Sequence, residues 1–202
     1  MSRLFIIIVT LVVLSGYSSA QDSTKPRKKH KMTDTVGVVN GSVIRLYDFR
    51  ELLSDITRTE APDSIVQDTE FTRYVNMTWE RLVFDILIHQ EIEKRKLNIS
   101  EEELMRRLLR NPPEELRQDF TNPEGHFEKE AYAEFLQGTQ PDSARTLVLN
   151  YYHMQYEQED LFRALAPKAK SGKARHEAFA AWFKKALQAA RIEDRRTAFG
   201  YY

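Results

Sequence analysis

Hydrophobic residues recur at steps of three and four along Glu70–Leu97, a stretch without Gly or Pro that forms the longest helical pattern in the chain. This spacing places the side chains on one face of an α-helix. The face consists of Phe71, Tyr74, Val75, Thr78, Trp79, Leu82, Val83 and Ile86. In the middle, Leu82–Ile88 is apolar on nearly every side, which is typical of a helix enclosed by its neighbours. We therefore predict that this helix forms the axis of a small helical domain.

Two β-branched arms flank the dipeptide Asn40-Gly41 within Val36–Leu46. Asn-Gly favours a two-residue hairpin because both central positions of a type I′ turn need a positive φ angle. We predict one short β-hairpin here and no other sheet.

The remaining patterns predict more helices. Ser100 and Glu103 have the S-x-x-E form of a capping box, which marks a helix start, and Pro112 ends that helix. The predicted helices around the axis cover residues 47–59, 101–110, 128–137, 143–165 and about 174–195. The fold class is therefore mainly α, with one short N-terminal hairpin.

The long helix over Ser143–Leu165 has a predicted inner face. Its members are Leu147, Tyr151, Met154, Gln158, Leu161, Phe162 and Leu165. Tyr151 and Tyr152 are consecutive, so the two rings cannot both point inward at helical spacing.

Composition fits a single globular domain. The chain has 202 residues, 42% hydrophobic and 11% aromatic, which is enough for a core. The formal net charge is zero, so we expect no nucleic-acid partner. The chain has no Cys, which excludes disulfides, Cys-ligated zinc, iron–sulfur clusters and Cys nucleophiles.

The N-terminus has the pattern of an export signal. Arg3 precedes the apolar run Leu4–Leu14, and small residues follow up to Ala20. This pattern predicts a secretory signal peptide over residues 1–20, cleaved after Ala20. A membrane anchor needs about 20 apolar residues, so we predict no stable membrane span in the mature chain. Residues 21–34 are polar and basic, which predicts a disordered leader.

Patterns that indicate catalysis are missing from the sequence. The glycines form neither phosphate-binding motif, and the G-x-S-x-G motif is absent. No two His have metal-ligand spacing, so we predict no metal and no cofactor. Asp85 and His89 lie four residues apart on one helix face, as a proton-transfer dyad or a structural pair. We favour the structural pair because no nucleophile is placed beside them.

A series of motifs resembles the helical N-terminal domain of the SurA/PpiD family of periplasmic chaperones. The motifs follow the family's order of opening strand, turn and helices, and closing helix. The matching stretches are Val38–Ile44 with Tyr47 and Phe49, Leu87–Glu91, Leu97–Leu104, Asn111–Pro113 with Phe120, Gly125–Leu136 and Trp182–Asp194.

The chain departs from the family at one point. Family members usually carry parvulin-type prolyl isomerase domains between the helical region and the closing helix. Here only a short basic linker, residues 166–174, stands in that place, and below about 40 residues no autonomous core is expected. The resemblance therefore implies that residues 35–202 form a compact SurA N-terminal-like helical domain, closed by the C-terminal helix and lacking the isomerase. No catalytic residue is carried over.

The resemblance implies an ATP-independent periplasmic chaperone, or holdase. Its partners would be unfolded or partly folded envelope proteins rich in aromatic residues, such as outer-membrane proteins. Aromatic and Met side chains suit this task because their contacts are adaptable. The candidate client-binding residues are Phe120, Phe127, Tyr132, Tyr151, Tyr152, Met154 and Tyr156. Core packing is the alternative role for each of them.

Two other functions remain open from the sequence. The first is a non-catalytic structural or adaptor protein that binds one folded envelope partner. The second is a peptidyl-prolyl isomerase, for which the chain has little room. The oligomeric state does not follow from the sequence.

Overall fold

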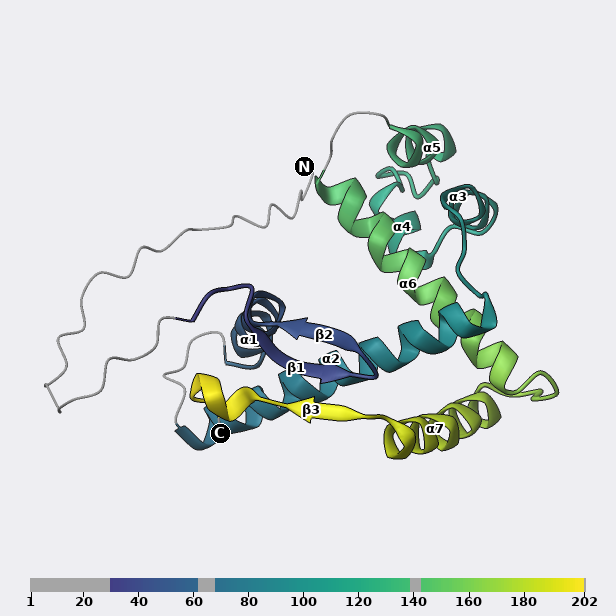
Figure 1. The fold of residues 1–202 in the computed structure, drawn as a ribbon. Helices are drawn as coiled ribbons and strands as arrows, with labels where there is room; N and C mark the ends of the chain where they lie inside the picture. Colours follow the sequence, from purple (N-terminus) through teal and green to yellow (C-terminus); the bar gives the residue numbers. More distant parts are fainter. Residues whose placement is uncertain (1–29, 62–67, 139–142, 202) are drawn as a thin grey trace, which may run out of the picture. The chain divides into compact units, whose positions relative to one another are not determined.

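A computed structural model describes residues 30–61, 68–138 and 143–201 (Figure 1). The predicted signal peptide and most of the predicted leader lie outside the described residues. Lys31–Tyr202 forms one unit. Its elements are β1 (Thr35–Val39), β2 (Ser42–Arg45), α1 (Leu46–Glu60), α2 (Asp68–Arg95), α3 (Glu101–Arg110), α4 (Glu114–Asp119), α5 (Lys129–Gln137), α6 (Ser143–Leu165), α7 (Gly172–Ala189), β3 (Ile192–Asp194) and the 3₁₀ turn η1 (Arg196–Phe199). The predicted mainly α class with an N-terminal hairpin is confirmed.

The hairpin forms where the sequence predicts it. Asn40 and Gly41 have φ angles of 49° and 92°, the positive values that a tight two-residue turn requires. Val39 pairs with Ser42 on either side of the turn. The Gln90 side-chain amide of α2 donates to the Val39 carbonyl (3.3 Å) and to the Ser42 hydroxyl (3.0 Å). The turn is therefore fixed to α2 as well as by its own backbone.

The hairpin belongs to the one sheet of the described residues, but that sheet has a third strand, which was not predicted. β3 pairs antiparallel with β1, with Ile192 opposite Val39, and the strand order is β2-β1-β3. Figure 1 shows β3, in yellow, beside the hairpin. The predicted last helix is also too long. α7 ends at Ala189 and Ala190 takes extended backbone angles, because the residues that follow join the sheet. A strand near the C-terminus therefore pairs with the strand that begins the described domain.

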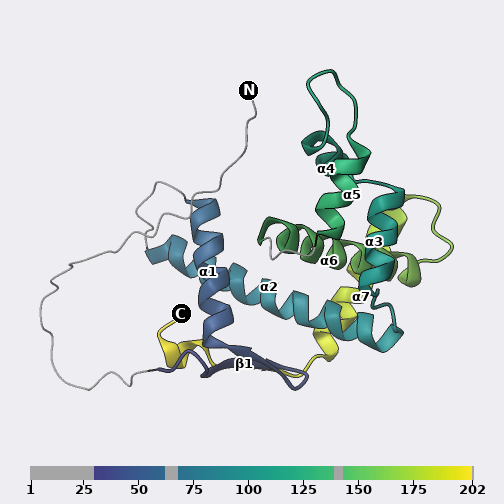
Figure 2. The same ribbon diagram turned by 90° about the horizontal axis from the view of Figure 1, so that it is seen from above.

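A first hydrophobic core lies between the sheet, α1 and the N-terminal half of α2. Figure 2 shows α1 crossing α2. The buried members are Val36, Val39, Ile44, Leu46, Phe49, Leu53, Tyr74, Val75, Trp79, Val83 and Leu87. Leu82 and Ile86 are half-buried against this core, and Phe183 of α7 packs on it as well. Segments from both ends of the described chain therefore enclose the axis helix.

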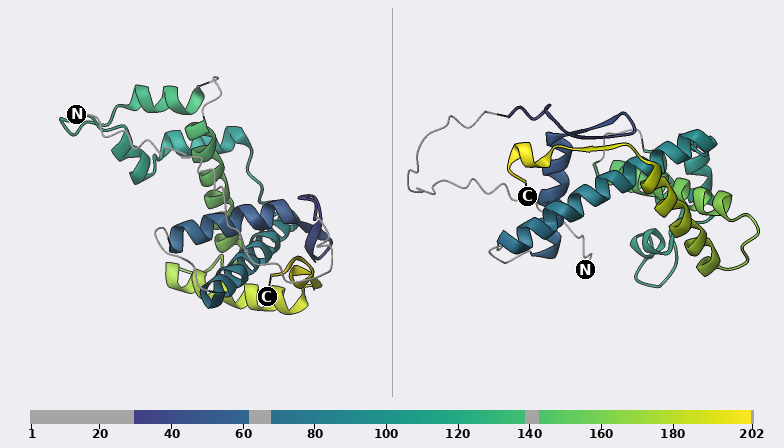
Figure 3. Two further views of the ribbon diagram at one scale, coloured as in Figure 1. Left: turned by 90° about the vertical axis from the view of Figure 1, so that its left-hand side faces the viewer. Right: turned by 60° about the horizontal axis from the view of Figure 1, so that its bottom comes forward.

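Two smaller cores complete the unit. One joins α3, α4 and α5 to α6, with Leu104, Leu108, Leu116, Tyr132 and Leu136 buried. The other joins the C-terminal half of α2 to α6 and α7, around Ile88, Ile92 and Leu161. In Figure 3, α6 runs from the α3–α5 group to α7, so it belongs to both cores.

The connection between α2 and α3 is held by α6. The Ile99 backbone N–H donates to Oε1 of Glu157 at 3.2 Å, and the Ile99 carbonyl lies 3.0 Å from Nε2 of His153. Nδ1 of His153 is 3.6 Å from the same Glu157 oxygen. Ser100 then caps α3, because its hydroxyl accepts from the Glu103 N–H at 3.2 Å, as the capping motif predicts.

Candidate functional site

Five of the seven candidate residues come together in the core of α3–α6. Phe120, Phe127, Tyr152 and Tyr156 are half-buried around the buried Tyr132. The ring centroid of Tyr132 lies 5.4 Å from that of Phe120 and 5.5 Å from that of Phe127. Such tilted and edge-on contacts favour aromatic packing. These five side chains therefore form the interior of the α3–α6 group.

Tyr132 is the most enclosed of the candidates. Its side chain is 1% exposed, and its hydroxyl donates to the Leu108 carbonyl at 3.2 Å. Burial raises the pKa of this hydroxyl to about 12, because the phenolate would lose its hydration. The geometry of Tyr132 supports a packing role.

The Tyr132 pKa predicts a loss of stability in alkali. The hydroxyl has a pKa of 10.0 in the unfolded chain and about 12 in the folded one. Tyr132 therefore does not lower the free energy of unfolding below pH 10. Between pH 10 and pH 12 the unfolded chain loses this proton first, so the free energy of unfolding declines by about 1.4 kcal/mol per pH unit. Urea unfolding across this range is expected to show a steeper decline for the unaltered protein than for Tyr132→Phe. Equal slopes would contradict the prediction.

The other two candidates, Tyr151 and Met154, face away from this core. They are 55% and 48% exposed, and Leu147 on the same face is 69% exposed. We call Leu147, Tyr151 and Met154 the α6 stripe. The predicted inner face of this helix is wrong from Leu147 to Met154, because Val148, Leu149, Tyr152 and Tyr156 pack inward instead. Of the consecutive tyrosines, Tyr152 points inward and Tyr151 outward.

The α6 stripe ends at a small cleft between α2 and α6. The cleft encloses about 230 Å³ and is lined by Asp85, Ile88, His89, Ile92, Met154, Glu157 and Gln158. Met154 belongs to both the stripe and the cleft, so the two adjoin.

Asp85 and His89 in this cleft do not pair with each other. Asp85 accepts from Arg81 at 3.0 Å, and Nε2 of His89 lies 3.3 Å from Glu93. Burial raises the pKa of Asp85, and the positive charge and hydrogen bond of Arg81 oppose that rise. The predicted structural pair is therefore wrong, because each side chain instead contacts a different residue of the same helix.

A second apolar groove was not predicted from the sequence. It encloses about 880 Å³ between α1, α2, α7 and β3. Its lining includes Leu52, Ile56, Met77, Phe84, Phe183 and Leu187, with Glu80 and Arg81 among the polar residues. These residues come from segments far apart in the chain, so no local motif indicates the groove. Helical periodicity identifies only which α1 and α2 residues share a face.

The α6 stripe and the groove offer mainly apolar side chains to another molecule. Within the described residues, no group of three or more His, Asp or Glu side chains has the geometry to hold a metal ion. Over the same part of the chain, every helix is too short or too polar to cross a bilayer. The α6 stripe and the groove can bind apolar side chains of another molecule without a covalent step.

The chain matches one known family. The family model described as the SurA-like N-terminal domain matches residues 2–136, which is more than half of the chain. The match spans the hairpin and α1 to α4 and reaches into α5, and no parvulin domain is evident beside it. The comparisons with curated proteins and with solved structures gave no match. The chain belongs to the family of SurA-like N-terminal domains.

Proposed function

We propose that this protein is an ATP-independent periplasmic chaperone of the holdase type. Its clients are unfolded or partly folded envelope proteins rich in aromatic residues, such as outer-membrane proteins. Membership of the SurA-like family supports a chaperone relationship. The observation that carries the proposal is the α6 stripe, where three large apolar side chains share one exposed helix face.

The α6 stripe suits a client that is extended and variable in sequence. Leu147 and Met154 lie about 10 Å apart along the helix axis, at 1.5 Å per residue. Tyr and Met provide contact area without fixed geometry, so different clients can use the same surface. A site of this kind selects for exposed apolar segments and ignores folded, polar surfaces.

The expected affinity of the stripe is low. Full burial of a large apolar side chain contributes roughly 1.5–3 kcal/mol, and about a third to a half of each stripe side chain is already covered. Three such residues therefore contribute roughly 3 kcal/mol, which corresponds to binding weaker than about 1 mM. Useful affinity requires that one client contacts several surfaces at once, and the groove between α1, α2 and α7 is a second surface of the same character.

A holdase role needs no reacting group, which agrees with the apolar character of both surfaces. The adaptor alternative requires a surface that is specific for one folded partner. We favour the chaperone because the α6 stripe consists of adaptable side chains on a single helix face.

Suppression of aggregation tests the proposed function. A denatured outer-membrane protein diluted from urea is expected to stay soluble at a near-stoichiometric amount of this protein, without ATP, as measured by light scattering. A folded polar protein of similar size serves as the control additive. Unchanged scattering, together with recovery of one folded partner by pull-down, would contradict the chaperone and favour the adaptor. Acceleration of proline isomerisation in a test peptide would establish an enzyme.

A further inference from the structure

The connection between α6 and α7 is strongly basic. Residues 166–176 contain four Lys or Arg and no Asp or Glu. We call Lys168, Lys170, Lys173 and Arg175 the basic turn. The three lysines are exposed, and Arg175 is half-exposed. The family match ends at residue 136, so it assigns no role to this segment.

Acidic neighbours do little to neutralise the basic turn. Nζ of Lys173 lies 4.0 Å from Oε1 of Glu177, and both side chains are largely exposed, which makes a weak ion pair. Glu159 and Asp160 at the end of α6 already accept from Arg163, at 2.9 Å and 2.8 Å. The charge of the basic turn is therefore largely left for another molecule.

The position of these cations does not stabilise α7. The N-terminal end of a helix carries a partial positive charge, which favours acidic residues in the first turn. The first turn of α7 has no acidic residue and instead contains Lys173 and Arg175. In contrast, α3 begins with Glu101, Glu102 and Glu103. The arrangement at α7 costs stability, so a role in binding accounts for it better than a role in folding.

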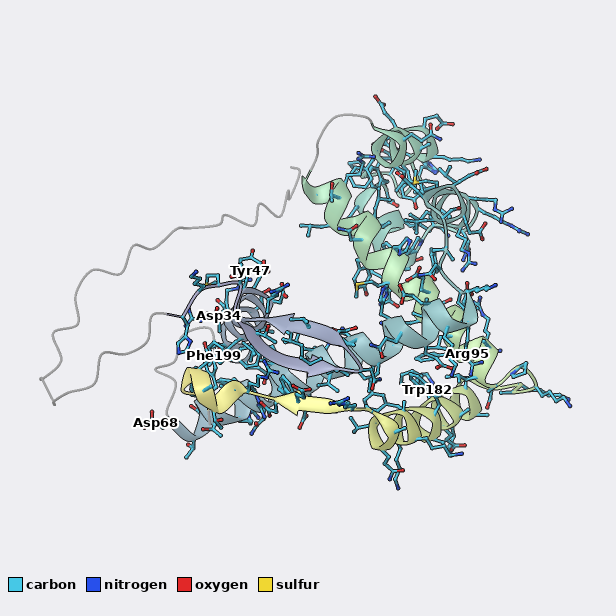
Figure 4. All side chains as sticks on the ribbon, in the orientation of Figure 1. Asp34, Tyr47, Asp68, Arg95, Trp182 and Phe199 are labelled. Carbon is cyan, nitrogen blue, oxygen red and sulfur yellow. The ribbon has the colours of Figure 1, made fainter. Side chains whose placement is uncertain are left out.

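A second basic group lies at the same end of the unit. Lys94, Arg95 and Lys96 close α2, and Leu97 packs in the core that α2 shares with α6 and α7. Figure 4 labels Arg95 at this end of α2. Glu91 accepts from Arg95, and it lies 3.6 Å from Lys94. Glu91 therefore offsets part of the charge of Lys94 and Arg95, and the exposed Lys96 adds to the basic surface.

We propose that the basic turn, with the end of α2, docks on an anionic lipid surface. Lysine is a compact charge on a flexible stem, which suits a layer of many phosphate groups better than one shaped site. An acidic polypeptide would instead favour the bidentate contacts that arginine makes. The α6 stripe ends at Met154, about 18 Å along the helix axis from Ala166. Docking through the basic turn therefore leaves the stripe accessible.

Vesicle co-sedimentation tests this proposal on the purified mature protein, residues 21–202. Binding is expected to phosphatidylcholine vesicles that contain phosphatidylglycerol, but not to pure phosphatidylcholine, and it should weaken as salt rises. The variant Lys168→Glu/Lys170→Glu is expected to bind at least about tenfold more weakly. The control Arg110→Glu/Lys129→Glu changes the net charge equally at exposed positions on α3 and α5 and should bind like the unaltered protein.

Several outcomes would overturn the proposal. Equal binding to neutral vesicles would show that charge is not the cause. Full binding by the Lys168/Lys170 variant would assign the binding elsewhere, for example to the basic residues before Asp34. Equal losses of vesicle binding in both double variants would show that only the net charge of the protein matters, and not the position of the basic turn. Competition by free polyglutamate, but not by inorganic phosphate at the same charge, would favour an acidic polypeptide. The Lys168/Lys170 variant should still suppress aggregation, so this proposal can fail independently of the chaperone.

Discussion

Gly37→Ala is expected to destabilise the protein by about 3 kcal/mol, the upper end of the usual range for overpacking. A Cβ atom at Gly37 would lie 2.3 Å and 2.6 Å from two ring carbons of Trp79, and 2.8 Å from the Glu193 carbonyl oxygen. The Glu193 carbonyl belongs to the backbone of β3, so it cannot move away without disturbing the β1–β3 pairing, and the Arg196 guanidinium lies over the Trp79 ring at 4.9 Å. Urea unfolding followed by circular dichroism measures the loss.

Gly172→Ala is the matched control. A Cβ atom at this position would meet no other atom within 4 Å, so the free energy of unfolding should change by less than about 0.5 kcal/mol. A tolerated alanine at Gly37 would mean that β1, β3 and Trp79 are not packed together. The Gly37 result therefore also tests whether β3 closes the sheet.

Glu157→Ala has the second large expected effect, a loss of about 2–4 kcal/mol. The Glu157 side chain is nearly buried and accepts from the Ile99 N–H, with His153 beside it. Alanine would leave the N–H of Ile99, in the connection between α2 and α3, without its acceptor on α6. Glu157→Gln keeps a carbonyl oxygen of the same reach and should lose less. Thermal unfolding of both variants measures the difference.

Glu159→Ala serves as the control for Glu157. Glu159 lies two residues further along α6 and is exposed, and its partner Arg163 also contacts Asp160. Its removal is expected to change stability by no more than about 1 kcal/mol. Similar losses at Glu157 and Glu159 would mean that the contact to Ile99 contributes nothing special to the fold.

Local patterns predicted the parts of the fold that depend on local geometry. The turn at Asn40-Gly41 and the cap at Ser100 form as expected, because each depends on a few consecutive residues. The axis helix also begins and ends within two residues of the predicted bounds. Its buried face is the predicted one at Tyr74, Val75 and Trp79, among others, whereas Phe71 in the first turn is 38% exposed.

Features that depend on distant partners could not be predicted in this way. Ile192–Asp194 continues a helical pattern in the sequence, and only its pairing with β1 makes it a strand. In α6, apolar residues occur on more than one face, so periodicity alone does not tell which face meets the core. The packing of Tyr152 and Tyr156 against α3–α5 decides that question and leaves Tyr151 outside. The sequence therefore indicated Tyr151 and Met154 as candidates, but it assigned both of them, together with Leu147, to the inner face of α6.

The central claim is that the α6 stripe holds unfolded clients, and a matched pair of double variants tests it most directly. Tyr151→Gln/Met154→Gln removes one exposed Tyr and one exposed Met from the stripe. Met32→Gln/Tyr47→Gln removes the same two side-chain types, 42% and 52% exposed, near the hairpin. Glutamine preserves helix propensity at Tyr47, Tyr151 and Met154, and Met32 lies in an exposed turn, so both variants should remain folded.

The measurement is the protein concentration that halves the aggregation of a denatured outer-membrane protein. This concentration is expected to rise about thirtyfold for the Tyr151/Met154 variant, because roughly 1 kcal/mol of contact is lost per side chain and about 1.4 kcal/mol corresponds to a tenfold change. No change is expected for the Met32/Tyr47 variant. Equal effects of the two variants, or none from the Tyr151/Met154 variant, would contradict the claim that the α6 stripe holds the client.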